Sequence, residues 1–162
     1  MAGKNKNKNK TTSSVVAQNR RARHDYFIDD TFEAGMQLFG TEVKSLRQGQ
    51  VSINESHAGE KNGAIYLFNA LISEYSQCSP KFQHDPKRPR KLLLHKREID
   101  RLLGAVQKKG VTLVPLKIYF SEKGLAKLLL GVGRGKKQHD KRETEKQRDW
   151  DRQKQRVLSD HS

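Results

Sequence analysis

The chain has 162 residues, of which 33% are hydrophobic and 31% charged, and its 33 basic against 18 acidic side chains give a formal net charge of +15 at pH 7. This length excludes a large multidomain enzyme, and the sequence offers neither a secretory signal nor an apolar run near the roughly 20 residues of a membrane span. Cys78 is the only cysteine, which excludes an internal disulfide and a cysteine-rich zinc site, so we expect a reduced, cytoplasmic protein.

The first part of the chain predicts a solvated arm, strands and a helix. Residues 1–14 alternate Lys with Asn before turning to Thr and Ser, and we expect them to form a disordered basic arm. Residues 25–30 and 32–40 are rich in aromatic and aliphatic side chains, which suits a strand pair or one bent strand. A short helix should follow, with Thr41 as its N-cap and Gly49 at its end.

The middle of the chain predicts two strands, a loop and the clearest helix. Residues 51–53 and 65–72 have strand-like patterns on either side of a turn-like segment at 59–63. Three prolines keep residues 76–90 in an extended loop. Apolar positions at helical spacing, followed by Gly110, predict a helix over 95–108.

Residues 111–120 and 126–132 then alternate apolar positions around a turn, which predicts a hairpin with Val114, Leu116, Ile118 and Phe120 on one face. Pro115 cannot donate to a strand ladder, so its strand should lie at an edge or carry a bulge. The expected fold is mainly β: a small antiparallel barrel over residues 15–133 with two to three flanking helices.

Residues 134–162 form a basic tail with too few large apolar residues for a core. Helix formers and acid-to-base pairs three residues apart recur along it. An isolated helix of this kind is weakly stable in water. We therefore expect the tail to be disordered when free and to become helical on a partner.

The positive charge is concentrated in three separate regions. Residues 1–24 hold seven basic side chains and no acidic one, residues 87–101 hold seven against two, and residues 134–162 hold ten against six. Residues 25–86 are acidic overall, with four basic against nine acidic side chains. Such a distribution suits contact with a phosphate backbone at several places.

Signals for an enzyme or a metal site are weak. The glycine-rich stretch at 131–137 lacks the spacing and the Ser or Thr of a nucleotide-binding loop, although its glycines would let the backbone approach a phosphate. The six histidines show no metal-ligand spacing, and no nucleophile motif is present. A ribonuclease that uses two histidines brought together by the fold stays formally possible. We expect no catalytic residue, metal or cofactor.

Basic residues next to aromatic or apolar ones are the better candidates for a binding surface. Arg20, Arg21 and Arg23 precede Tyr26, and Arg88, Arg90 and Lys91 precede an apolar trio that should anchor their loop while the basic groups face outward. Arg134 follows the last strand, where it could neutralise a phosphate. Glu33 and Lys127 are weaker candidates. Glu33 could accept a hydrogen bond from a guanine edge, but a solvated strand glutamate is the commoner explanation, and a solvated lysine is the alternative for Lys127.

Longer motifs carry a specific resemblance. They are NRRARHDYFI at 19–28, FEAG at 32–35, GTEVKSLR at 40–47, RPRKLLL at 88–94, GKKQHDKR at 135–142 and RDW at 148–150. In this order they resemble the small protein B family of bacterial transfer-messenger RNA-binding proteins.

The resemblance implies an oligonucleotide-binding-fold barrel that binds the tRNA-like domain of transfer-messenger RNA. The RNA, charged with alanine and carried by elongation factor Tu, would be brought to stalled ribosomes for trans-translation. The family's RNA-binding face would use Tyr26, Glu33, Leu93 and Lys127. Its tail would enter the empty decoding centre and message channel, against 16S rRNA, through Lys136, Lys137, His139, Asp140, Lys141, Arg142 and Trp150.

A general RNA chaperone or a ribosome-associated RNA-binding protein is the alternative in the binding class. It would share the basic surfaces but would bind unrelated RNAs comparably.

Overall fold

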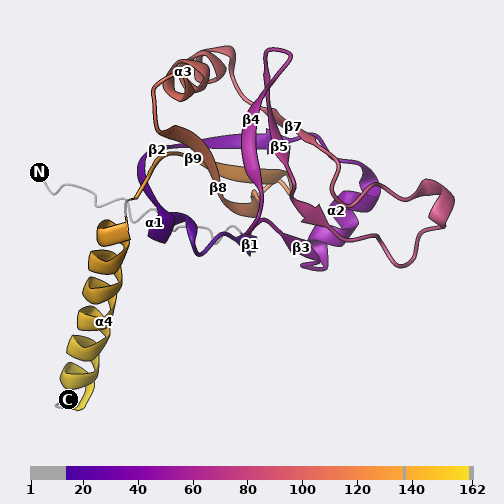
Figure 1. Ribbon diagram of the computed structural model, residues 1–162. Coiled ribbons are helices and arrows are strands. Elements are labelled where there is room, and N and C mark those ends of the chain that lie inside the picture. The colour runs from indigo at the N-terminus through magenta and orange to yellow at the C-terminus, as the bar shows by residue number, and fades with distance from the viewer. Residues whose placement is uncertain (1–13, 137, 161–162) are drawn as a thin grey trace, which may run out of the picture.

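The computed structural model describes residues 14–136 and 138–160, with side chains described for 14–136 and 141–160. Figure 1 shows the arrangement of its elements. The strands are β1 (Ser14–Gln18), β2 (Tyr26–Met36), β3 (Val51–Ser52), β4 (His57–Lys61), β5 (Ala64–Phe68), β6 (Leu71–Ile72), β7 (Arg90–Leu93), β8 (Val111–Phe120) and β9 (Ala126–Gly135). The helices are α1 (Ala22–Asp25), α2 (Gly40–Arg47), the 3-10 turn η1 (Pro80–Phe82), α3 (Lys96–Val106) and α4 (Gln138–Asp160).

A large antiparallel sheet organises the described residues. Its strand order is β1-β8-β4-β5-β7-β2-β9, and β8 also pairs with β9. This last pairing brings the far ends of the sheet together, so the sheet nearly closes into a ring. The small β3–β6 sheet lies outside that order. The antiparallel sheet was predicted, but four α-helices, one of them long, make the fold mixed α/β rather than mainly β.

The core fills the inside of the curved sheet and is closed by α2 and α3. Leu46 of α2 and Leu102 of α3 are fully buried among strand residues. The predicted helix at 95–108 is confirmed as α3. His95 immediately precedes the helix, and its backbone N–H donates to Glu98 Oε2 at 3.2 Å. Fully buried strand residues complete the core: Ala34, Ile65, Leu67, Ile118, Leu128 and Leu130.

The hairpin of β8 and β9 is confirmed, and so is the bulge expected near Pro115. The register shifts between Pro115 and Lys117. Because a bulge moves the following side chains to the opposite face, the expected single apolar face is wrong. Val114 and Leu116 pack with Ala22 in a second small cluster, whereas Ile118 joins the main core.

Several elements differ from those expected. Residues 25–40 hold one strand, β2, which is one of the two arrangements expected there, whereas β1, α1 and β7 have no counterpart among the predictions. β4 occupies most of the expected turn at 59–63, which is confined to Asn62 and Gly63, both with positive φ. The arm expected at 1–14 lies outside the described residues except for Ser14, which begins β1.

Helix α2 begins differently from the prediction. Phe39, rather than Thr41, precedes its first residue, and the Phe39 N–H donates to Glu42 Oε1 at 2.9 Å. The Thr41 hydroxyl instead lies 2.9 Å from Nδ1 of the buried His84. Gly49 has φ +72°, as its expected place after the helix requires.

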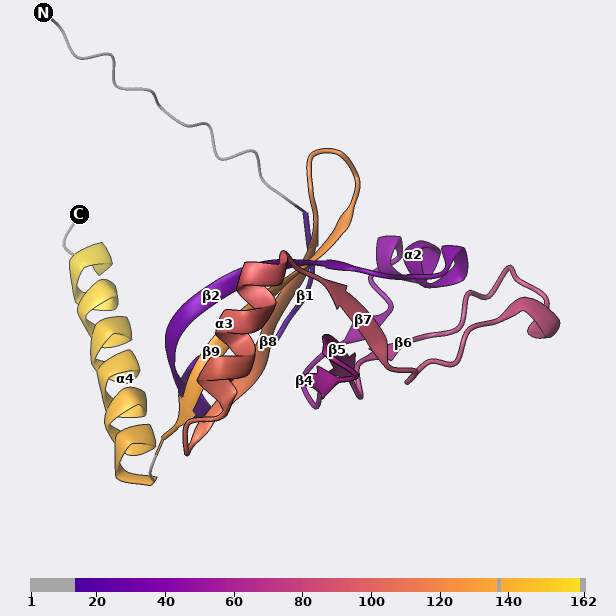
Figure 2. The same cartoon turned by 90° about the horizontal axis from the view of Figure 1, so that it is seen from above.

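Helix α4 and the segment 73–89 lie at opposite ends of the molecule in both views (Figures 1 and 2). β9 continues to Gly135, so α4 begins a few residues beyond the expected start of the tail at 134. Most described side chains of α4 are exposed. Among the described residues, no helix combines the length and apolar character that crossing a bilayer requires.

Candidate nucleic-acid interface

An open groove gathers four of the residues that the sequence singled out. Its volume is about 890 Å³, and it lies between β2, β7, the start of α3 and the tips of the β4–β5 and β8–β9 hairpins. The four residues are Glu33, Lys91, Leu93 and Lys127. Among its other lining residues are Asn62, Gly63, His95 and Leu125. Acidic, basic and apolar groups thus converge from segments far apart in the sequence.

Glu33 is held by two neighbours across the sheet. Its Oε2 accepts a hydrogen bond from the Tyr119 hydroxyl, and its Oε1 lies 3.9 Å from Lys127 Nζ. Burial first, and then the Glu33 carboxylate, raise the pKa of Tyr119 well above its ordinary value. The phenol therefore stays protonated and fixes the orientation of a carboxylate that is still 55% exposed.

Leu93 presents an apolar surface beside these charged groups. The residues of β7 alternate, so that Arg90 and Leu92 are buried while Lys91 and Leu93 point outward. Leu93 is 53% exposed. It lies opposite Gly35 of β2, where an added Cβ would come within 3.2 Å of the Leu93 Cβ. Gly35 thus leaves room for this leucine at the groove.

Tyr26 does not join that groove. It starts β2, opposite Gly135, whereas the groove lies at the other end, where Gly35 is opposite Lys127. The Tyr26 ring is half-buried against the small cluster of Ala22, Val114 and Leu116. The structure therefore separates Tyr26 from the three residues that the resemblance groups with it.

Arg20, Arg21 and Arg23 form a second basic region near the same end of β2 as Tyr26. All three are exposed: Arg20 and Arg21 lie on the turn between β1 and α1, and Arg23 lies in α1. Arg20 and Arg23 line a shallow pocket of about 450 Å³, to which Lys117 of β8 and Arg148 of α4 also contribute. This region is available to phosphates but is distinct from the groove.

The expectation that Arg90 faces outward is wrong. Its side chain is fully buried, where Nε donates to Glu42 Oε2 and Nη1 donates to the Ala70 carbonyl at 2.6 Å. A guanidinium group enclosed in this way cannot reach an RNA phosphate. Arg90 therefore supports the fold rather than the interface.

Arg88 is partly exposed and bound to the same carboxylate. Its Nη2 lies 2.5 Å from Glu42 Oε1, and its guanidinium carbon lies 4.1 Å from the centre of the exposed Phe39 ring. Burial alone would raise the pKa of Glu42, but the Phe39 N–H, Arg88 and Arg90 together hold it below its ordinary value. Sequence patterns gave no sign of this cluster, because Glu42 lies 46 residues or more from both arginines.

Arg134 is paired at the surface. Its Nε donates to Asp29 Oδ2 at 2.9 Å and its Nη2 to Asp29 Oδ1 at 3.2 Å. Both side chains are about half exposed, so the pair is accessible. The glycines before Arg134 do not form a phosphate loop, because they lie within β9.

The start of α4 is tied to α1 through contacts that the sequence did not indicate, although Lys141 itself was among the predicted tail residues. His24 Nε2 lies 2.7 Å from Glu145 Oε1, while its Nδ1 lies 2.9 Å from Asp25 Oδ1. Lys141 Nζ lies 3.5 Å from the same Asp25 oxygen. The hydrogen bond from His24, reinforced by Lys141, lowers the pKa of Asp25 against the effect of burial.

Lys136 closes this junction. Its Nζ donates to the Arg23 carbonyl at 2.9 Å and to Thr144 Oγ1 at 3.0 Å, and it lies 4.8 Å from the centre of the Phe27 ring. We call the contacts of Lys136, Lys141, His24 and Glu145 the tail junction. Of the tail residues that the sequence singled out, two therefore bind the body of the protein.

The other tail residues fall into two groups. Arg142 and Trp150 are exposed on α4, with Trp150 at 61%. Lys137 lies outside the described residues, and His139 and Asp140 lie in α4 among residues whose side chains are not described.

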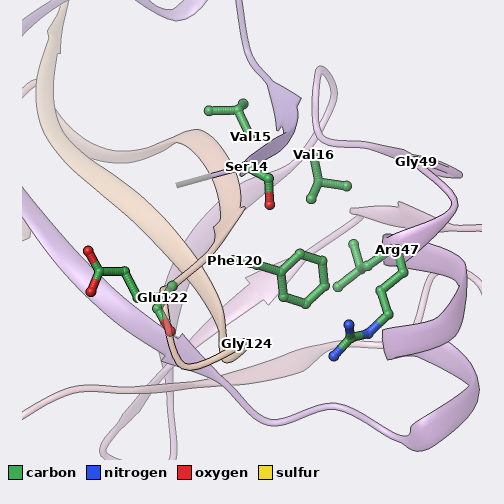
Figure 3. Close-up of a pocket in the computed structure, with 10 residues that line it drawn as sticks. Ser14, Val15, Val16, Arg47, Gly49, Phe120, Glu122 and Gly124 are labelled. Atoms are coloured by element: carbon green, nitrogen blue, oxygen red, sulfur yellow. The ribbon is translucent and has the colours of Figure 1, made fainter. Parts of the chain in front are cut away.

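A second pocket lies between β1, α2 and the β8–β9 turn. Figure 3 shows Phe120 pointing into it beside Arg47, whose guanidinium carbon is 5.2 Å from the ring centre. Its volume is about 540 Å³. None of the predicted RNA-binding or tail residues lines it. Among the described residues no cluster of three metal-ligating side chains occurs anywhere.

Comparison with known proteins gives a consistent result. The family described as SmpB protein matches residues 16–160. An SsrA-binding protein of Nitrobacter hamburgensis is 60% identical over 151 residues, covering 93% of this chain and 96% of its own length. One from Afipia carboxidovorans is 60% identical over 144 residues, covering 89% and 91%.

A solved structure agrees in fold. Its chain, described in work on tmRNA-SmpB and the centre of the bacterial ribosome, is 56% identical and superposes with a TM-score of 0.63. The match covers 78% of this chain and 91% of that one.

Proposed function

This chain belongs to the SmpB family, and we propose that it binds the tRNA-like domain of transfer-messenger RNA and delivers it to stalled ribosomes for trans-translation. Delivery would free the ribosome and tag the incomplete protein. The protein is an RNA-binding factor rather than an enzyme. Elongation factor Tu takes part only through the charged RNA, and the site of action is the cytoplasm.

The observation that carries this proposal is the groove in which Glu33, Leu93 and Lys127 meet. Lys127 and Lys91 supply positive charge for the phosphate backbone, and Leu93 supplies an exposed apolar surface for a nucleoside. Glu33, oriented by Tyr119, can accept hydrogen bonds from base or sugar donors. A surface that combines positive charge, an apolar side chain and an oriented acceptor can recognise the shape of an RNA. Positive charge alone would only attract phosphates.

The strand order also supports the assignment of the barrel to a known class of fold. A short antiparallel sheet that nearly closes and presents a groove on its surface is the arrangement that oligonucleotide-binding folds use. We assign the barrel to that class, with Arg20, Arg21 and Arg23 as a further phosphate-binding region.

The tail would read the occupancy of the ribosome. Helix α4 extends away from the barrel and exposes Arg142 and Trp150. The tail over residues 134–162, with ten basic against six acidic side chains, suits the decoding centre and message channel of the small subunit, where 16S rRNA provides a polyanionic wall. Lys136, Lys137, His139, Asp140 and Lys141 would lie at the entrance to that channel.

A competition titration tests the proposal. We expect the protein to bind a tRNA-like-domain RNA in the presence of excess ordinary tRNA, and to keep that preference when the salt concentration is raised. Phosphate attraction without recognition weakens steeply with salt. If both RNAs compete equally and binding collapses with salt, the protein is a general RNA chaperone or ribosome-associated RNA-binding protein instead.

Truncation separates the two parts of the proposal. Removing residues 134–162 should leave binding of the RNA intact and abolish tagging of stalled products. Equal loss of both activities would show that the division between barrel and tail is incorrect.

A further inference from the structure

The outer face of the β4–β5 hairpin carries three stacked rings. His57 lies opposite Phe68 in the register, with ring centres 5.4 Å apart and planes at 23°. The Tyr66 ring also stacks with Phe68, at 6.2 Å and 29°. Along β5, Tyr66 and Phe68 alternate with Ile65 and Leu67, which are fully buried in the core. We call the rings of His57, Tyr66 and Phe68 the ring platform.

Two lysines border the platform. Lys61 Nζ lies 5.6 Å from the centre of the Tyr66 ring, and Lys91 of β7 lies opposite Tyr66 in the register. Both lysines are exposed. The acidic side chain on the hairpin, Glu60, accepts a hydrogen bond from the Gly63 N–H in the turn. Two lysines thus border the aromatic rings, against one acidic side chain on the hairpin.

Gly59 keeps the platform open. It lies opposite Tyr66 in the middle of β4, and an added Cβ would be 3.5 Å from the Phe68 ring. A larger side chain there would extend over the rings. A glycine in the middle of a strand weakens that strand and often marks close approach of a ligand or another backbone.

The platform lies next to the groove. Lys91 is opposite Tyr66 of the platform and also lines the groove, as do the hairpin residues Asn62, Gly63 and Ala64. A molecule held against Lys127 and Leu93 can thus extend along Lys91 to Tyr66.

We propose that the ring platform stacks unpaired bases of the RNA whose backbone is held in the groove. Near-parallel aromatic rings accept bases of any sequence on their faces, and lysines beside the rings neutralise the connecting phosphates. Double-stranded RNA hides its base faces, so the platform selects loop or end nucleotides. This inference rests on the proposed function, since it adds a second contact to the same RNA.

A fluorescence reporter tests the stacking directly. Trp150→Phe removes the only natural tryptophan, and Tyr66→Trp then places a reporter in the platform. The matched control is Phe82→Trp in the same background, because Phe82 is exposed by 71% and also has a lysine over its ring but lies away from the groove. Stoichiometric tRNA-like-domain RNA should quench the emission of the tryptophan at 66 and leave that at 82 unchanged.

Affinity gives the second measurement. The double variant His57→Thr and Tyr66→Leu keeps strand-compatible side chains and should weaken binding of the same RNA by about tenfold or more, since each base stack is worth that order of affinity. Phe82→Leu should change it little. If the rings instead bind a protein partner or only stabilise the hairpin, the RNA will not quench the tryptophan at 66 and the double variant will bind the RNA with unchanged affinity. That result would overturn the inference.

The groove variant Lys127→Ala separates the two proposals. If it weakens binding while the platform variants do not, the proposed function stands and the platform has no role in it. If the unsubstituted protein does not prefer the tRNA-like RNA over ordinary tRNA, the proposed function fails and the present inference fails with it.

Discussion

Glu42 of α2 and Arg90 of β7 form an ion pair in which both side chains are fully buried. The same carboxylate also binds Arg88, and Arg90 donates to the carbonyls of Ala70 and Pro86. The pair therefore fixes β7 against α2 and the preceding loop. Because β7 carries Lys91 and Leu93 into the groove, a structural ion pair supports the surface that we propose for RNA binding.

We expect Arg90→Met to be strongly destabilising. It leaves the buried Glu42 with Arg88 as its only cationic partner among the described contacts. Breaking a buried pair by removing one partner costs about 3–5 kcal/mol of the free energy of unfolding. Urea unfolding at neutral pH measures this loss. The matched control is Arg134→Met, which removes one partner of the exposed pair with Asp29 and should cost no more than about 1 kcal/mol. Equal losses in the two variants would contradict the structural role of Arg90.

The same pair predicts a pH dependence. The folded protein holds the pKa of Glu42 below its ordinary value of 4.5. A carboxyl group whose pKa is lowered by folding stabilises the folded state above the unfolded pKa, and this contribution is lost as the pH falls through the folded pKa. The free energy of unfolding should therefore decrease as the pH is lowered below about 4.5.

Glu42→Gln should make that decrease shallower, because glutamine does not titrate. Asp25, whose pKa is also lowered, keeps part of the slope. Urea unfolding at a series of pH values between about 3 and 7 compares the two slopes. A slope that is the same in both proteins would show that Glu42 does not contribute.

The tail junction should control how firmly α4 is held. His24→Ala removes the contact with Glu145 and should speed amide hydrogen exchange in the first turns of α4. The loss of global stability should be below about 1 kcal/mol, because Glu145 is largely exposed and such pairs are weak. Exchange measured by mass spectrometry over residues 138–150 tests this, with Asp149→Ala as a control farther along the helix. Unchanged protection in the His24 variant would mean that the junction does not hold the helix.

Local sequence patterns predicted much of the fold. The period of apolar residues in α3 and the alternation in the β8–β9 hairpin both follow from neighbouring residues. Pro115 indicated the bulge within β8. What the bulge does could not be read locally, because it depends on which strand lies opposite. It transfers Leu116 to a different cluster from Ile118.

The candidate site was predictable only through longer motifs. Glu33 and Lys127 were ambiguous as single residues, and nothing local indicated that they face Leu93 across a groove. Arg90 shows the opposite failure, since a basic residue in a basic loop is expected to be solvated. Its carboxylate partner lies 48 residues away, and only the folded chain brings the two together.

The glycines of β9 give the last prediction. At Gly131 an added Cβ would lie 3.1 Å from Ile28 Cγ2 and 3.2 Å from Leu116 Cδ1, whereas at Gly135 it would meet nothing within 4 Å. Gly131 thus lets side chains of β2 and β8 pack over the strand, rather than letting a phosphate approach. Gly131→Val should lower the free energy of unfolding by about 1–3 kcal/mol through overpacking, and Gly135→Val should lower it much less. Urea unfolding measures both losses. Under conditions in which the Gly131 variant is fully folded, its affinity for RNA should equal that of the unsubstituted protein. Loss of RNA binding without loss of stability would instead restore a phosphate-contacting role for this stretch.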